Sequence, residues 1–431
     1  MRRRDVLGLL GSVLAPRLPG NWPQWRGPSA DGVSPEEKVP TQWSATENVA
    51  WRTPLPGLGT STPILWDNRV FLTCQIGDGP FDPSSQDFEA AHAARRSGRR
   101  QDLEFAVQAF ALADGRLAWQ HRFPAAGRLA QFHEKHNMAS PSCVTDGERL
   151  YAWMGNGQVR ALDLGGKLLW QHHLGQEFPP FEVLWGHGSS PVLYKDTLLL
   201  LCEHPAGGYL LAFDKRTGKL HWKAPRGKDR RSYTTPFVAA GPRGDELIVN
   251  SSDRLEALDP TTGEVLWYTG DANRVPIGMP VCHDGVLYAT RGYASGPYLA
   301  VKLGGRGDVT KSHVLWEIPT GAPYVSSLLY YQGLLYLATE RGIVTCADPQ
   351  NGAVIWRERL GGCFTASPVG AAGRVYVFNE DGEGIVLAAG RRFQIVARNH
   401  LEERILASPA MARGHLFVRT DENLYCIGGR A

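Results

Sequence analysis

Three short polar segments hold the side chains of this sequence best suited to binding a ligand. They are His133-Glu134-Lys135-His136-Asn137, Trp185-Gly186-His187-Gly188, and a basic stretch with Arg226, Lys228, Arg230 and Arg231 before Tyr233. Basic and imidazole groups suit an anionic or polyhydroxylated ligand, and an indole can stack on a planar group. The alternative is structural, because the same groups could satisfy the backbone of neighbouring loops. The candidate ligand-binding residues are His133, Lys135, His136, Asn137, Trp185, His187, Arg230, Arg231 and Tyr233.

We expect no metal centre and assign no catalytic residue. His133 and His136 are three residues apart and Glu203-His204 lies elsewhere, but neither pair has a zinc spacing with a third ligand nearby. The sequence contains no GxSxG elbow, P-loop, HExxH motif or glycine-rich dinucleotide fingerprint. The residues alone therefore favour binding over catalysis.

The charge of the chain gives no reason to expect a nucleic-acid partner. The formal net charge of the 431 residues is +3. All of it comes from the first 20 residues, which contain Arg2, Arg3, Arg4 and Arg17 against Asp5. Because the remainder is near neutral, a basic surface for nucleic acid or an anionic membrane is not indicated.

A repeated hairpin must position the three polar segments. Its clearest copy is Tyr209–Trp222, YLLAFDKRTGKLHW, in which alternating apolar residues on both sides of a turn predict two strands. The side chain of Asp214 can accept from the N–H groups just ahead, and Gly218 supplies the positive φ that the bend needs. The tryptophans of the pattern A-x-D-x-x-T-G-x-x-x-W stand at 51, 119, 170, 222, 267, 316 and 356. Spacings mostly of about 40–50 residues are typical of propeller blades.

A second marker, a small hydroxylated residue usually before proline, opens each unit. It occurs at Ser61-Thr62-Pro63, Ser140-Pro141, Ser189-Ser190-Pro191, Thr234-Thr235-Pro236, Ser326-Ser327, Ser367-Pro368 and Ser408-Pro409, with Met279-Pro280 as a variant. Eight openings predict eight four-stranded antiparallel blades, with Phe393–Ala397 replacing the tryptophan strand in the seventh. The last unit has three strands of its own, so the strand Asn48–Pro54 should complete it and remove the free sheet edges.

The predicted fold is therefore all-β, a single eight-bladed β-propeller over residues 48–427, closed by its N-terminal strand. In such a ring the connections between blades lie on one face, with the loops between second and third strands, around the central channel. The three polar segments are three successive connections. We expect them to meet at the channel mouth, where loop-built sites form.

The repeats resemble those of pyrroloquinoline quinone (PQQ)-type eight-bladed propellers. The likeness is clearest at Ala212–Trp222 and Ala257–Trp267 and covers about residues 48–427. WPQWRGPSADGVS, KHNMASPSCVTDGERLYAWMGNG and WGHGSSPVLYKD are similar to segments of an uncharacterised exported group of such proteins. The resemblance implies an eight-bladed propeller and allows a bound PQQ with calcium. The adjacent-cysteine disulfide of the quinone-dependent dehydrogenases has no counterpart here, nor does their catalytic Asp with a calcium-ligand Glu/Asn set.

Two segments before the ring and one within it are not part of the repeats. Residues 1–20 resemble a twin-arginine export signal, with Arg3-Arg4 ahead of an apolar run too short to span a bilayer. Residues 21–47 are rich in Trp and Pro and are predicted to form an extended arm packed on the ring by Trp22, Trp25 and Trp43. An insertion at about 76–100 is predicted to contain a short helix starting after Ser84-Ser85 and ending at Gly98.

Three functions agree with these features. The first is an exported, non-catalytic binding or scaffold protein, periplasmic or extracellular, that engages a protein, peptide or glycan with its channel-mouth loops. The second is a PQQ-dependent alcohol or sugar dehydrogenase, and the third is an envelope protein-assembly scaffold. We expect a monomer without a membrane span in the mature chain, and the missing dehydrogenase residues place the enzyme below the binding protein.

Overall fold

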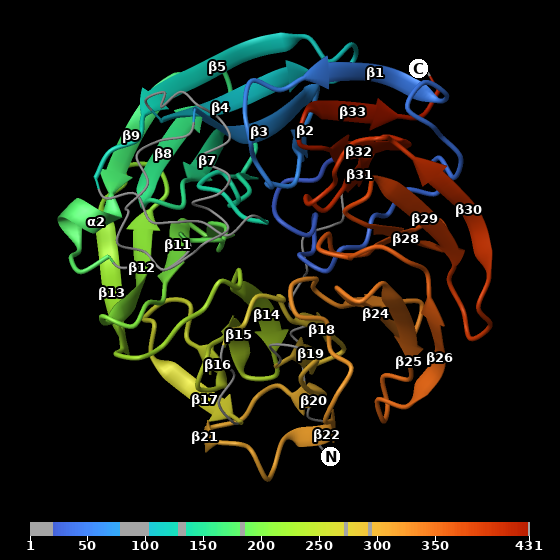
Figure 1. Cartoon of the computed structure of the whole chain (residues 1–431). Helices are drawn as coiled ribbons and strands as arrows, with labels where there is room; N and C mark the ends of the chain where they lie inside the picture. Colours follow the sequence, from blue (N-terminus) through green and yellow to red (C-terminus); the bar gives the residue numbers. More distant parts are fainter. Residues whose placement is uncertain are drawn as a thin grey trace, which may run out of the picture.

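The computed structural model describes residues 20–77, 103–127, 135–181, 186–270, 275–291 and 295–429. Eight antiparallel sheets follow one another around a central channel, which confirms the predicted eight-bladed propeller (Figure 1). The predicted export signal up to residue 19 and the predicted helix within 84–98 lie outside the described residues. No helix in the described ranges is both long and apolar enough to cross a membrane.

The first four blades comprise strands β2 to β17. Blade 1 contains β2 (Ile64–Trp66), β3 (Arg69–Ile76), β4 (Glu104–Ala111) and β5 (Leu117–Pro124). Blade 2 contains β6 (Val144–Thr145), β7 (Arg149–Trp153), β8 (Gln158–Asp163) and β9 (Leu168–His173), followed by helix α2 (Leu174–Glu177). Blade 3 contains β10 (Val192–Tyr194), β11 (Thr197–Cys202), β12 (Gly208–Asp214) and β13 (Leu220–Gly227). Blade 4 contains β14 (Phe237–Gly241), β15 (Gly244–Asn250), β16 (Leu255–Leu258) and β17 (Val265–Thr269).

The second four blades complete the ring. Blade 5 contains β18 (Val281–His283), β19 (Val286–Thr290), β20 (Tyr298–Lys302) and β22 (Val314–Ile318). Blade 6 contains β23 (Leu329–Tyr331), β24 (Leu334–Ala338), β25 (Ile343–Ala347) and β26 (Val354–Arg359). Blade 7 contains β27 (Val369–Ala371), β28 (Arg374–Phe378), β29 (Glu383–Ala388) and β30 (Ile395–His400). Blade 8 contains β31 (Ala410–Ala412), β32 (His415–Arg419), β33 (Asn423–Ile427) and β1 (Val49–Pro54).

The ring closes as the sequence predicts, because β1 pairs antiparallel with β33 and becomes the outermost strand of blade 8 (Figure 1). Two details differ from the prediction. The outer strand of blade 7 begins at Ile395, two residues after the predicted start at Phe393. Blade 4 gains a fifth strand, β21 (Gly307–Asp308), which pairs parallel with β17 and covers part of its outer edge.

Five of the seven hairpin tryptophans fasten their blade to the next one, whereas Nε1 of Trp267 donates to Glu246 of its own blade at 2.7 Å. Trp51 Nε1 donates to Leu112 O of blade 1 at 2.8 Å, and Trp119 Nε1 donates to Leu164 O of blade 2 at 2.9 Å. Gly115 has φ +71°, and a Cβ added there would lie 2.4 Å from Cε3 of Trp51. The glycine of the motif is therefore needed twice, for its positive φ and for the close approach of an indole. Equivalent hydrogen bonds join Trp170 to Lys215, Trp316 to Pro349 and Trp356 to Gly390.

The repeated aspartate of the hairpin acts as the sequence predicts. The Oδ1 atom of Asp214 accepts from the backbone N–H of Arg216 at 3.0 Å and of Thr217 at 2.7 Å, and from the hydroxyl of Thr217 at 2.8 Å. These bonds stabilise the carboxylate and lower the pKa of Asp214, with the Thr217 hydroxyl as the largest cause.

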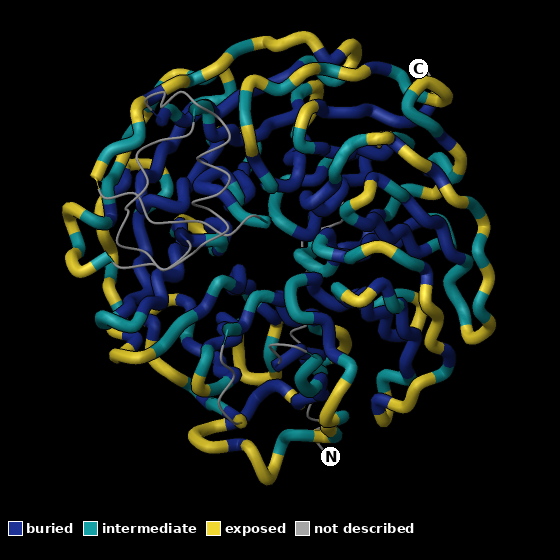
Figure 2. The backbone as a smooth tube through the Cα atoms, viewed as in Figure 1, coloured by how far each residue is buried: buried dark blue, intermediate teal, exposed yellow. Residues whose placement is uncertain are grey.

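The buried interior lies between blades, where the two faces of neighbouring sheets meet (Figure 2). The second and third strands are almost wholly buried, as in β11 and β12, whereas the outermost strands alternate between exposed and half-buried positions. All seven cysteines are free thiols; Cys74 and Cys202 are buried, whereas Cys282 is only half-buried. The buried core of the molecule thus lies within the blades of the ring.

Candidate functional site

A ring of hydroxyl groups lines the channel next to its mouth. The residue two positions before each innermost strand is Thr62, Ser142, Ser190, Thr235, Met279, Ser327, Ser367 or Ser408. In blade 2 this position is Ser142, so the predicted marker Ser140-Pro141 is wrong by two residues. The backbone N–H of one blade donates to the hydroxyl of the next, as from Thr62 to Ser142 at 2.9 Å and from Ser142 to Ser190 at 2.9 Å.

The relay of hydroxyls continues around most of the ring. Further bonds join Ser190 to Thr235, Met279 to Ser327, Ser327 to Ser367 and Ser367 to Ser408, at 2.8–3.0 Å. There are two exceptions. Met279 of blade 5 has no hydroxyl to accept a hydrogen bond from blade 4. Between blades 8 and 1 the hydroxyl is the donor, since Thr62 Oγ1 donates to Ser408 O at 3.0 Å. The blade-opening hydroxyls are therefore structural acceptors that tie neighbouring blades together.

The arm before β1 lies in the channel at the end opposite the mouth. Trp22 bridges Leu65 of β2, and Val33 bridges Gly370 of β27, both on free edges of innermost strands. In the turn between β31 and β32, the backbone N–H of Arg413 donates to Oε1 of Glu36 in the arm at 2.8 Å. In Figure 1 the blue N-terminal segment leads from the centre of the ring to β1 at its outer edge. The arm therefore covers inner strand edges that a propeller otherwise leaves unpaired.

A buried arginine holds the arm in place. Arg26 is 2% exposed and donates to the carbonyl oxygens of Pro368 at 2.6 Å and Leu328 at 3.2 Å, at the start of blades 7 and 6. Burial lowers the pKa of Arg26 to about 10, and nearby Asp31 acts in the opposite direction. Since the guanidinium stays charged near neutral pH, it binds the arm to two blades through charge-assisted hydrogen bonds.

Between the arm and the mouth lies a cavity of about 320 Å³. Its lining combines the ring hydroxyls with three aromatic side chains, Trp25 of the arm, Tyr233 and Tyr324. Lys135, His136 and Glu340 are the lining residues with ionisable groups other than tyrosine. Aliphatic groups complete the wall, at Val275, Ile277, Val325 and Leu406. Aromatic and aliphatic groups with a few polar ones are what ligand pockets present.

The structure brings three of the nine predicted site residues to this cavity, namely Lys135, His136 and Tyr233. Lys135 reaches across the mouth, where its Nζ lies 2.8 Å from Oε1 of Glu380 and 3.3 Å from Sγ of Cys363, both in the region of blade 7. Burial alone would raise the pKa of Glu380, but hydrogen bonds from Lys135, Thr365 and other neighbours lower it to about 2.

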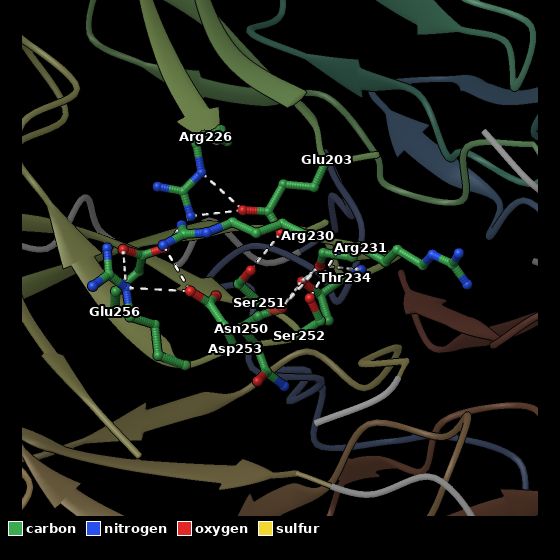
Figure 3. Close-up of polar contacts among 12 residues, drawn as sticks. Glu203, Arg226, Arg230, Arg231, Thr234, Asn250, Ser251, Ser252, Asp253 and Glu256 are labelled. Atoms are coloured by element: carbon green, nitrogen blue, oxygen red, sulfur yellow. Dashed lines mark hydrogen bonds and ion pairs between the residues drawn. The ribbon is translucent and has the colours of Figure 1, made fainter. Parts of the chain in front are cut away.

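Arg230 belongs instead to a buried ion network between blades 3 and 4 (Figure 3). Its Nη1 lies 3.0 Å from Oε1 of Glu256, which also receives Arg226. Arg226 lies 2.7 Å from Oε1 of Glu203, and Ser251 Oγ donates to the other oxygen of Glu203 at 2.7 Å. Burial would lower the pKa of Arg226, but the two glutamates outweigh it and raise the pKa. The network joins one inter-blade connection to the loops of both blades.

Three other predicted residues lie near the mouth without lining the cavity. The Oδ1 atom of Asn137 accepts from Ala139 N at 2.9 Å, so its side chain shapes the loop that carries Lys135 and His136. Arg231 points away from the ion network in Figure 3, and its backbone N–H donates to Ser252 Oγ at 2.9 Å.

His187 is fully buried beside the rings of Trp153 and Phe181, at centroid distances of 5.2 and 4.8 Å. Neither ring nitrogen of His187 has a hydrogen-bond partner among the described residues. Burial lowers its pKa well below the usual value, and nearby His204 and His136 lower it further. The last two predicted residues, His133 and Trp185, lie outside the described part of the chain.

Sequence reasoning missed Trp25, Tyr324 and Glu340. Trp25 lies in an arm that we expected only to pack on the ring, and Glu340 lies in the loop between β24 and β25. Glu340 Oε2 accepts from Tyr324 N at 3.3 Å, which links the two lining residues. No group of three His, Cys, Asp or Glu side chains in the described ranges is arranged to hold a metal ion.

Comparison with known proteins agrees with the fold. The curated outer membrane protein assembly factor BamB of Yersinia pestis is 23% identical over 242 residues, 56% of this chain and 50% of that protein. The chain thus spans about half the length of the curated relatives it matches. The structure of BamB from Moraxella catarrhalis matches with a TM-score of 0.55 at 16% identity, covering 88% of this chain and 98% of that one. The structure of a europium-containing methanol dehydrogenase matches with a TM-score of 0.67 at 12% identity, covering 94% of this chain and 91% of that one.

The family profile described as "Outer membrane protein assembly factor BamB" matches residues 37–177, 104–243 and 307–392. These matches cover more than half of the sequence and fall on the repeated blades. The two solved structures are too distant in sequence to show more than the fold. The chain therefore belongs to the PQQ-like β-propeller family that this profile describes.

Proposed function

We propose that this protein is an exported, non-catalytic scaffold of the cell envelope that engages a partner protein with the loops at its channel mouth. The observation that carries the proposal is that these loops are fixed in position by ion pairs. Lys135 joins the loop before blade 2 to Glu380 of blade 7, and Arg226 joins blades 3 and 4. A surface held in this way meets a partner with little loss of conformational freedom.

The chemistry of the cavity supports binding over catalysis. A catalytic serine needs a base within hydrogen-bond distance. The hydroxyls of Ser190, Ser367 and Ser408, which line the cavity, instead accept backbone N–H groups from neighbouring blades. The names of the matched relatives, which are assembly factors, further favour a scaffold in protein assembly, and their outer-membrane setting favours a periplasmic location.

A quinone-dependent dehydrogenase is the alternative that the family leaves open. PQQ carries three carboxylates and would need several positive groups and a calcium site around it. Lys135 is the sole lysine or arginine of the described cavity lining and is engaged by Glu380, whereas Glu340 adds a negative charge. The residues present therefore do not match PQQ with calcium, and we derive no reaction step through it.

Site-specific photo-crosslinking in the native host tests the proposal. A photoreactive residue at Tyr324 samples the mouth, and one at Asp284, in an exposed turn between β18 and β19, samples the opposite face. We expect an envelope protein to be captured from position 324 and not from 284. Deleting the gene should also lower the amount of folded outer-membrane protein. Equal capture from both faces, or an unchanged outer membrane, would contradict the proposal.

Reconstitution separates the scaffold from the enzyme. Purified protein mixed with PQQ and calcium should retain no quinone absorbance after gel filtration and should show no dye-linked oxidation of alcohols or sugars. A stoichiometric quinone complex with such activity would establish the enzyme instead.

A further inference from the structure

The cavity under the mouth is closed at its far end by the arm, with Trp25 among its lining. We propose that this cup binds a small neutral cyclic polyol, a mono- or disaccharide unit. The inference deepens the proposed function, because it rests on the mouth being a binding face. It names a ligand class for the cavity, whereas the partner protein would bind the surrounding loops.

The hydroxyl ring presents hydrogen-bond donors to the cavity. The oxygen atoms of its members accept backbone N–H groups from neighbouring blades, so that lone pairs are used. In the described residues, the O–H protons of these hydroxyls have no acceptor within the protein. The members are Ser142, Ser190, Thr235, Ser327, Ser367 and Ser408, all of which line the cavity. A ligand rich in oxygen acceptors would complete these bonds.

The two sides of the cup differ in chemistry. The connections into blades 5 and 6 supply Val275, Ile277 and Tyr324, and the arm supplies Trp25. The connection into blade 2 supplies Lys135 and His136, with Ser140 behind them. A pyranose ring has the same asymmetry, because its C–H groups form an apolar face and its hydroxyls a polar edge. An aromatic ring receives such an apolar face, and hydroxyls and charged groups receive the edge.

Charge and size favour a neutral sugar over an anion. Lys135 and Arg404 share the carboxylate of Glu380, and Glu340 adds a negative charge at the lining, so the site has no surplus of positive charge. The cavity of about 320 Å³ has room for roughly ten waters at about 30 Å³ each. That space is at the lower end of the range of ligand pockets, about 300–1,000 Å³, and suits one or two sugar rings.

The test is saturation-transfer NMR and calorimetry on the full chain with a panel of neutral mono- and disaccharides, with inorganic phosphate and PQQ as charged competitors. We expect saturable binding of at least one sugar and none of phosphate. Trp25→Phe should weaken that binding about 3- to 10-fold, since it removes part of the stacking surface. Trp43→Phe is the matched control, because Trp43 belongs to the same arm but packs on Phe378 and does not line the cup.

The outcomes are separable. A circular-dichroism melt of each variant shows whether the arm still folds, and Tyr324→Phe provides a second change in the cup that leaves the arm intact. Absence of saturable sugar binding, equal weakening by Trp25→Phe and Trp43→Phe, or preferential binding of PQQ would each overturn the inference. Crosslinking from the mouth would survive such a failure, so the sugar site and the scaffold function can fail independently.

Discussion

Substituting Gly115 by alanine should separate backbone strain from the contact that closes the ring. Gly115 has φ +71°, and a Cβ at this position would lie 2.4 Å from the indole of Trp51. Gly285, in the turn between β18 and β19, has φ +73° and no heavy atom within 4 Å of such a Cβ. The same substitution at the two positions therefore costs the same strain and differs in the side chains that the new Cβ meets, which at position 115 are the indole of Trp51 and the hydroxyl of Thr53 at 2.5 Å.

The expected magnitudes follow from these contacts. A left-handed conformation costs an L-residue about 1–2 kcal/mol, and this is the whole expected effect of Gly285→Ala. In Gly115→Ala the indole must move, which weakens the hydrogen bond from Trp51 to Leu112 by about 1 kcal/mol. Crowding adds about 1–3 kcal/mol, so the total is about 3–6 kcal/mol.

Urea unfolding of both variants measures the difference. Equal midpoints at equal slope would refute the reasoning, because they would show that the indole adapts without cost. Combining Gly115→Ala with Trp51→Ala gives a second check. Once the indole is absent the alanine meets only the hydroxyl of Thr53, and the hydrogen bond of Trp51 is not lost twice. The double variant should therefore lose about 2–4 kcal/mol less than the sum of the single changes.

Three further expectations concern charged groups. Since the pKa of Glu380 falls from 4.5 to about 2 on folding, its ion pair with Lys135 should contribute about 1–2 kcal/mol to stability after screening. This contribution is present above about pH 4.5 and is lost toward pH 2. Urea unfolding at a series of pH values should show it in the native chain and not in Glu380→Gln. Burial lowers the pKa of His187, so the unfolded chain takes up a proton at a higher pH than the folded one, and stability should fall as the pH drops below about 6.5. His187→Phe should flatten this pH dependence of stability, and an unchanged slope would contradict the account. Arg226→Met should cost about 3–5 kcal/mol in urea unfolding because it leaves the buried carboxylate of Glu203 without its ion pair, whereas Glu256 keeps Arg230. Adding Glu203→Gln should restore part of the loss, and a single variant as stable as the native chain would show that the network is dispensable.

The repeat was readable from the sequence because its causes are local. Asp214, Gly218 and Trp222 lie within one hairpin, so their spacing reports both the turn and the strands. Counting such hairpins gave the number of blades, and the missing fourth strand of the last blade gave the closure by β1. Position Ser142 was misassigned because a serine and a proline two residues earlier mimic the marker.

The site was harder to predict because its partners come from separate blades. The sequence placed Arg230 in a connection, but its role depends on Glu256, which the fold brings from another loop. Trp25 lies in a segment without periodicity. The position of that segment depends on its bridges to the edges of the innermost strands, which exist only once the ring has formed. Patterns of residue types indicated which loops lie at the mouth. They could not show which charged side chains form ion pairs within the ring, as Arg230 does with Glu256.

The pairing of β1 with β33 also constrains how the protein reaches its folded state. Trp51 of β1 pairs with Cys426 of β33, so the first strand of the ring can pair only after the last strand has formed. Closing so long a loop is entropically slow, and contacts of this sequence separation lower folding rates. Blades 1 to 7 can each form from consecutive residues as synthesis proceeds, whereas blade 8 and the arm in the channel can assemble only afterwards. Ring closure should therefore be the last and slowest folding step, and the partly formed ring would expose the edges of β2 and β33 until then.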